Sequence, residues 1–222
     1  MRTHSIWWAL ASLLVASCSG SVPIDHEGHE FEDGEEVDLG TDPWRERRRM
    51  DVDQLEASLR AVTGGIGWER MNSDGTVRTR YFSAYSDTLG VPDYVNSTSE
   101  ELSVSLLFQK FLDDAARSAC RRVADREAGD GPEYEGGPQG TFAPVDLTRE
   151  TPPTDAEIDA ALADLLLRFH GRRVEASSPE LEPWRLLSAR LTEAATEAEL
   201  PPKRAWEGVC VALVTHPDFY TY

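Results

Sequence analysis

Apolar side chains recur at helical spacing in five segments after residue 50, and this periodicity constrains the fold most strongly. In the first segment, Val52, Leu55, Leu59 and Val62 lie on one face of a helix that Gly64 would end. The other four apolar stripes run through residues 108–123, 158–169, 184–195 and 206–214. The pattern predicts a mainly α protein, with about five helices in one bundle-like domain.

A small β-hairpin is predicted near residues 66–82, between the first two helices. Residues 66–71 and 76–82 flank the sequence Asn72-Ser73-Asp74-Gly75, in which Asp-Gly is a strong hairpin-turn signal. Phe82, Tyr85 and Leu89 have the spacing of a short helical turn that would end at Gly90. We therefore expect a hairpin followed by a helical turn.

Capping and breaking residues predict the ends of the later helices. Residues 97–101 offer overlapping capping boxes before the second helix, and Thr154 with Glu157 forms another before the third. Residues 129–153 are rich in glycine and proline, so we expect an irregular loop there. The last helix is expected to open at Pro201-Pro202 and to stop before His216-Pro217.

The N-terminus has the features of a bacterial secretory signal. Arg2 precedes an apolar run over residues 6–15, which is too short to span a membrane, and small residues follow it. The sequence Val15-Ala16-Ser17-Cys18 resembles the lipobox of bacterial lipoproteins. That resemblance implies cleavage after residue 17, acylation of Cys18 and, because Ser19 is not aspartate, the outer membrane. The alternatives are an ordinary signal that releases a soluble protein, and an uncleaved anchor.

Acidic residues are concentrated directly after Cys18. Residues 19–43 contain nine acidic residues and no Lys or Arg, within a chain of net charge −18. A segment with so much like charge and so few apolar residues is typical of a disordered, extended tether. The charge disfavours binding to nucleic acid and to anionic lipid. We therefore predict a signal over residues 1–17, a tether over 18–43 and one helical domain over 44–222.

Two cysteines remain once Cys18 is assigned to the lipid. Cys120 and Cys210 both lie on predicted apolar helix faces, in a compartment that permits disulfides. A disulfide between them is favoured, and two buried thiols are the alternative. Neither cysteine belongs to a Cys-x-x-Cys or haem-attachment motif, so no cofactor is expected.

The histidines and paired carboxylates do not predict a metal or catalytic site. His26 and His29 lie in the acidic tether, where solvation is favoured over weak binding of a divalent ion. His170 would end a helix, where a cation interacts favourably with the helix dipole. His216-Pro217-Asp218 has the character of a helix stop, and Asp113-Asp114 that of a solvated helix face. Catalytic residues are unknown from the sequence.

Two stretches carry a resemblance to a known group of domains. They are residues 49–68, continued by 88–94 and 111–116, and residues 206–219, which end in Pro217-Asp218-Phe219. Together they resemble uncharacterised helical domains of exported planctomycete-type and myxobacterial proteins. Relatives in that group are often joined to, or encoded near, c-type cytochromes and sulfatase-like proteins. The resemblance implies an exported partner, but no catalytic residues.

These features favour a membrane-tethered lipoprotein that docks an exported protein without catalysing a reaction. The alternative is a periplasmic enzyme or enzyme subunit, for which residues 64–94, dense in glycine and aromatic residues, are the candidate surface. A deep polar pocket would favour the enzyme, whereas an exposed apolar surface would favour docking.

Overall fold

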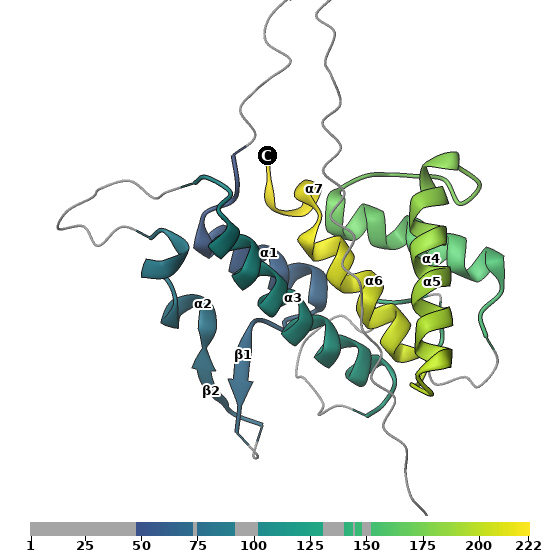
Figure 1. The fold of residues 1–222 in the computed structure, drawn as a ribbon, viewed down its shortest axis with the longest axis horizontal. Coiled ribbons are helices and arrows are strands. Elements are labelled where there is room, and N and C mark those ends of the chain that lie inside the picture. The colour runs from purple at the N-terminus through teal and green to yellow at the C-terminus, as the bar shows by residue number, and fades with distance from the viewer. Residues whose placement is uncertain (1–47, 73–74, 92–101, 131–139, 144, 148–151) are drawn as a thin grey trace, which may run out of the picture. The chain divides into compact units, whose positions relative to one another are not determined.

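The computed structural model describes residues 48–72, 75–91, 102–130, 140–143, 145–147 and 152–222. All of them belong to one compact unit, Trp44–Tyr222. The predicted signal, Cys18 and the acidic segment with His26 and His29 lie outside the described residues. The described part contains seven α-helices and a two-stranded antiparallel sheet, which confirms a mainly helical fold with a small hairpin (Figure 1). None of the helices in this part has the length and apolar character needed to cross a membrane.

Helix α1 (Val52–Thr63) matches the first predicted helix. Its predicted apolar residues are all buried in the core. Asp51 caps the N-terminus in a capping box with Gln54, and Gly64 ends the helix in the left-handed conformation, with φ of 68°. The boundaries of α1 are therefore set by local sequence signals.

The hairpin follows α1, and its strands are shorter than predicted. Strand β1 (Glu69–Met71) pairs antiparallel with β2 (Val77–Arg80), and an irregularity in register falls between Arg70 and Met71. Helix α2 (Tyr81–Ala84) and the 3₁₀ turn η1 (Asp87–Leu89) come next, as the predicted helical turn requires. The order of hairpin and helical turn is confirmed.

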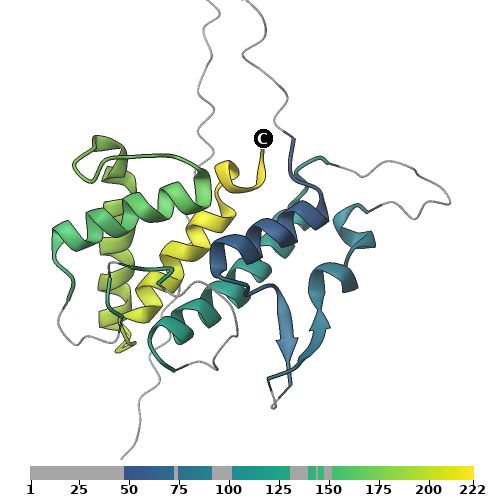
Figure 2. The same cartoon turned by 180° about the vertical axis from the view of Figure 1, so that it is seen from behind.

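Helices α3 (Leu106–Glu127) and α6 (Lys203–Thr215) pack side by side at the centre of the described domain (Figures 1 and 2). Their facing surfaces include small and branched residues that are almost fully buried, among them Ala119 and Val209. A disulfide joins Cys120 of α3 to Cys210 of α6, with 5.7 Å between the two Cα atoms. The predicted bridge is therefore present, and it links the two central helices.

The second half of the domain packs around α6. Helix α4 (Asp155–His170) leads through the 3₁₀ turn η2 (Pro179–Leu181) to α5 (Glu182–Glu197), and α7 (Pro217–Tyr220) follows α6. A Cβ atom at Gly208 would lie 2.9 Å from the side chain of Leu191, so glycine permits the close approach of α5 and α6. Both α4 and α5 contact α6.

Two element boundaries differ from the prediction. Helix α3 begins at Leu106, where the Ser105 side chain accepts a hydrogen bond from the Phe108 backbone N–H. The capping boxes predicted at residues 97–101 lie outside the described residues. His216 does end α6, but its side chain also caps α7, a helix that the sequence analysis did not predict. Proline is well suited to the first turn of a helix, so Pro217 marks a start as well as a stop.

A buried arginine connects the start of the domain to three other segments. Arg49 is 1% exposed, and its guanidinium donates hydrogen bonds to the backbone carbonyls of Met50, Leu89 and Ser103. It also lies 4.7 Å from the centre of the Phe108 ring. The planar group, with donors in fixed directions, suits this role better than a lysine ammonium would.

Candidate functional site

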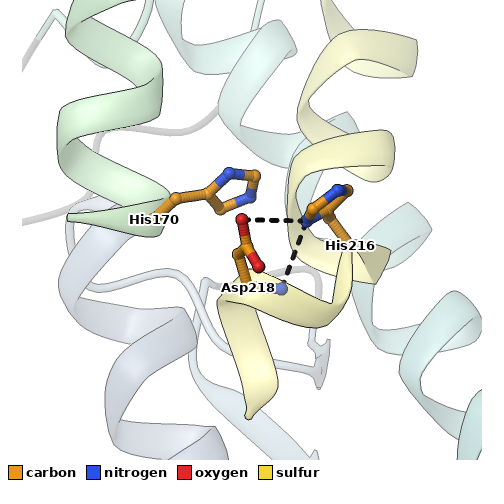
Figure 3. A group of neighbouring side chains, drawn as sticks. All are labelled: His170, His216 and Asp218. Carbon is orange, nitrogen blue, oxygen red and sulfur yellow. Dashed lines mark hydrogen bonds and ion pairs between the residues drawn. The ribbon is translucent and has the colours of Figure 1, made fainter. Parts of the chain in front are cut away.

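The structure brings His170 together with His216 and Asp218, which lie more than 40 residues further along the sequence. His170 is the last residue of α4, and His216 lies between α6 and α7. Asp218 is in the first turn of α7, directly after Pro217. Figure 3 shows the Asp218 carboxylate beside the edges of both imidazole rings. Three separate helix ends therefore converge on one point.

The three side chains are close enough to share a small ligand. Taking one nitrogen or oxygen from each residue, the three atoms lie within 4.8 Å of one another. The imidazole ring centres of His170 and His216 are 4.8 Å apart. The Asp218 Oδ2 atom lies 3.7 Å from Nδ1 of His216 and 3.6 Å from a guanidinium nitrogen of Arg172. The last two distances exceed those of direct hydrogen bonds.

His170 is held in one orientation by its surroundings. Its Nε2 atom lies 3.0 Å from the carbonyl oxygen of Leu213. Because a carbonyl only accepts, Nε2 carries the proton and the Nδ1 atom of the neutral ring carries a lone pair. That Nδ1 atom is buried and has no hydrogen-bond partner among the described residues. Burial lowers the pKa of His170 despite the Leu213 hydrogen bond, which favours the neutral ring at neutral pH.

The other side chains of this cluster are more accessible. The side chain of His216 is 39% exposed and that of Asp218 is 27% exposed. The Trp184 ring lies against both imidazoles, with ring centres 5.7 Å from His170 and 5.8 Å from His216. The cluster is therefore covered by an indole on one side and reachable by solvent.

Two imidazoles and a carboxylate form a donor set that binds first-row divalent ions such as Zn²⁺. His170, His216 and Asp218 are thus the described residues that could hold a metal. This group was not predicted from the sequence, where both histidines were expected at helix ends. Those expectations agree with their positions, but no short motif links His170 to His216 and Asp218.

A second feature is an open cavity between α4, α5 and the start of α6. Its volume is about 720 Å³, within the range of ligand-binding sites. Its walls are mainly apolar and include Ile158 of α4, Ala189 of α5 and Trp206 of α6, together with Leu147 and Leu200. Leu200 is 51% exposed, so apolar surface continues to the rim of the cavity.

Polar groups of the same cavity are mostly engaged with one another. The Arg185 guanidinium makes two hydrogen bonds to the Asp159 carboxylate, at 2.5 and 3.0 Å. A third guanidinium bond, 2.8 Å long, runs to the carbonyl of Ala176. Asp155 lies at the exposed edge, in the first turn of α4. The cavity could therefore bind an apolar group next to acidic side chains.

The predicted enzyme surface at residues 64–94 contains a packed aromatic cluster in its described part. Trp68 is 7% exposed, and its ring contacts the rings of Tyr81, Phe82, Tyr85 and Phe111, with centres 5.3 to 5.9 Å away. These contacts serve to attach the hairpin and α2 to α3. Residues 92–94 of the predicted surface lie outside the described part.

The remaining candidate residues have the positions that a structural role requires. Asp113 pairs with Arg117 at 2.8 Å, and Asp114 pairs with Lys110, each at i,i+4 spacing on a partly exposed face. Cys120 and Cys210 are bonded to each other in the disulfide. Asp113 and Asp114 therefore lie on the solvated helix face that was expected.

Neither protein-family models, nor curated proteins, nor solved structures match this chain. The resemblance to exported helical domains stays a prediction.

Proposed function

We propose that the protein is a lipid-anchored accessory protein of the bacterial cell envelope that docks an exported partner without catalysing a reaction itself. In this proposal Cys18 carries the lipid, residues 18–43 form the tether, and the helical domain presents the docking surface. The outer membrane is the proposed location. The periplasmic enzyme remains the alternative prediction.

The open cavity between α4, α5 and α6 carries the docking proposal. It combines a volume of about 720 Å³ with mainly apolar walls and an exposed leucine at its rim. Large exposed apolar patches are rare on soluble monomers and often mark binding sites. Large apolar side chains of a partner would gain most from burial here, at about 25 cal/mol for each Å² removed from water.

Charge indicates the chemistry of the partner. The chain has a net charge of −18, and Asp155 lies at the edge of the cavity. Complementary charge speeds encounter and selects partners. We therefore propose an exported protein that inserts apolar side chains flanked by Lys or Arg. An acidic partner would be repelled.

The test compares two tryptophan substitutions on α5. Ala189 is exposed and lines the cavity, so Ala189→Trp fills the cavity without disturbing the core. Ala194 is also exposed on α5 but is not among the cavity-lining residues, so Ala194→Trp is the matched control. A photo-crosslinking residue at Leu200 of the membrane-bound protein identifies the partner, and calorimetry then measures its affinity for each purified variant.

We expect Ala189→Trp to lower the affinity for the identified partner at least about tenfold, or about 1.4 kcal/mol, while Ala194→Trp leaves this affinity unchanged. Equal affinities in the two variants would refute docking at the cavity. The anchor is tested separately with a fatty-acid analogue, which should label the wild-type protein and not Cys18→Ala. Label retained by Cys18→Ala would contradict lipidation at this residue.

A further inference from the structure

We infer that His170, His216 and Asp218 form a binding site for one divalent first-row metal ion, with Zn²⁺ as its representative. This site is separate from the docking cavity and goes beyond the proposed function. The protein would supply three ligands, one imidazole nitrogen from each histidine and one carboxylate oxygen. The first observation behind it is the convergence of three possible ligand atoms within 4.8 Å (Figure 3).

The distances suit a group that closes around an ion. Zinc bonds to histidine and carboxylate are about 2.0–2.2 Å long, which places neighbouring ligand atoms about 3.3 Å apart in a tetrahedral site. Closing from 4.8 Å needs a shift of about 1.5 Å, shared among the three side chains. His216 and Asp218 are partly exposed, so their side chains have room to rotate.

The second observation is the unsatisfied nitrogen of His170. A buried polar atom without a partner is uncommon and costs free energy, so the unpaired Nδ1 lone pair of His170 is available to a metal ion. In Figure 3 the His170 nitrogen beside Asp218 is Nε2, so the ring must turn about its Cβ–Cγ bond to direct Nδ1 toward Asp218. The Leu213 carbonyl beside the same ring is the kind of outer partner that orients metal-bound histidines. The unpaired nitrogen and its neighbouring carbonyl are a separate observation from the short distances among the three residues.

Charges around the site tolerate a cation. Arg172 lies 3.6 Å from Asp218, but it also forms a 2.7 Å pair with Glu180, which offsets its charge. The chain as a whole carries a net charge of −18, so it attracts divalent cations. Trp184 shields one side of the histidine pair. The opposite, solvent-reachable side leaves a coordination position for water.

The nature of the donors selects the class of ion. Imidazole nitrogen suits zinc and its transition-metal neighbours, whereas calcium and magnesium prefer sites made of oxygen ligands. We therefore expect Zn²⁺ and Co²⁺ to bind at this site and Ca²⁺ not to compete at equal concentration.

The experiment titrates the full chain, freed of metal by a chelator, with Zn²⁺ by calorimetry and with Co²⁺ by visible absorption. Asp218→Asn keeps the size of the side chain, and His216→Gln removes an imidazole. The double variant His26→Ala/His29→Ala is the matched control, because it removes a different pair of histidines, which lies in the acidic segment. Circular dichroism verifies that each variant is folded.

We expect one Zn²⁺ to bind per chain with a dissociation constant in the micromolar range or below. Either Asp218→Asn or His216→Gln should weaken this affinity about tenfold or more, and the double variant should leave it unchanged. Affinity no tighter than millimolar, binding unchanged in both site variants, or binding abolished by the double variant would overturn the site. If the site variants fail to fold, the Co²⁺ spectrum of the wild-type chain decides: intense four-coordinate bands support the site, and weak bands typical of six oxygen ligands contradict it.

Discussion

Replacing both cysteines of the Cys120–Cys210 disulfide with alanine should destabilise the protein strongly without changing its fold. The bridge joins residues 90 positions apart, so it restricts a long loop of the unfolded chain. The chain-entropy relation gives about 4.6 kcal/mol for a loop of this length at 25 °C. A domain is stable by about 5–15 kcal/mol in total, so the expected loss is a large fraction of that. The folded state should persist because α3 and α6 pack through many other buried residues.

Urea unfolding measures this prediction, with Cys18→Ser as the background because the chain has three cysteines. The comparison covers the oxidised protein, the same protein after reduction, and the double alanine variant. We expect the free energy of unfolding to fall by about 4–5 kcal/mol on reduction, and the slope against urea to rise as the unfolded chain expands. A loss below about 1.5 kcal/mol would refute the entropy argument, since it would mean that the unfolded chain is already compact.

Three further predictions concern single residues. Thr154→Ala should lower the free energy of unfolding by about 1 kcal/mol, because it removes the side chain that caps α4; thermal or urea unfolding measures this, and an unchanged stability would contradict it. Arg49→Lys should cost about 2–4 kcal/mol, since an ammonium cannot reach all three carbonyls that the buried guanidinium binds; a loss under 1 kcal/mol would show that the geometry of the guanidinium is not needed. Burial alone would raise the pKa of Asp125, but hydrogen bonds and charge from Lys203 and Arg204 hold it below its ordinary value. The folded-state pKa is therefore depressed, so the stability that this carboxylate contributes is full above about pH 4 and is lost as the pH falls through the folded-state value. Asp125→Asn should be less stable than wild type at about pH 7, and the difference should shrink near pH 2; a constant difference would contradict the linkage.

Local signals in the sequence were sufficient for most of the helices. The apolar stripe of α1 and the left-handed glycine that ends this helix are both encoded within about a dozen residues. The Thr154–Glu157 capping box of α4 is just as local. The disulfide was also predictable, because both cysteines lie on apolar helix faces. Each of these features depends on neighbours in the sequence or on a single pairing.

The features that escaped prediction depend on how distant segments meet. Glu69 shows this in the hairpin: its side chain is 5% exposed because Arg60 of α1 and Arg122 of α3 reach its carboxylate. Periodicity assigns no such partner to a charged residue in a short strand. His170 and His216 each have an adequate local explanation, as a helix end and a helix stop, which hides their proximity in space. A local explanation that suffices does not exclude a tertiary role.

Helix α6 connects the two proposed sites and determines whether they can influence each other. Trp206 in its first turns lines the docking cavity, while His216 directly after its last residue belongs to the metal cluster. The two positions are about 15 Å apart along the helix axis. Between them, Cys210 attaches α6 to α3 covalently, and the buried packing of both helices opposes sliding. Coupling between sites requires an element with two arrangements, and a helix fixed in this way favours one. Zn²⁺ and the docked partner should therefore bind independently while the disulfide is intact.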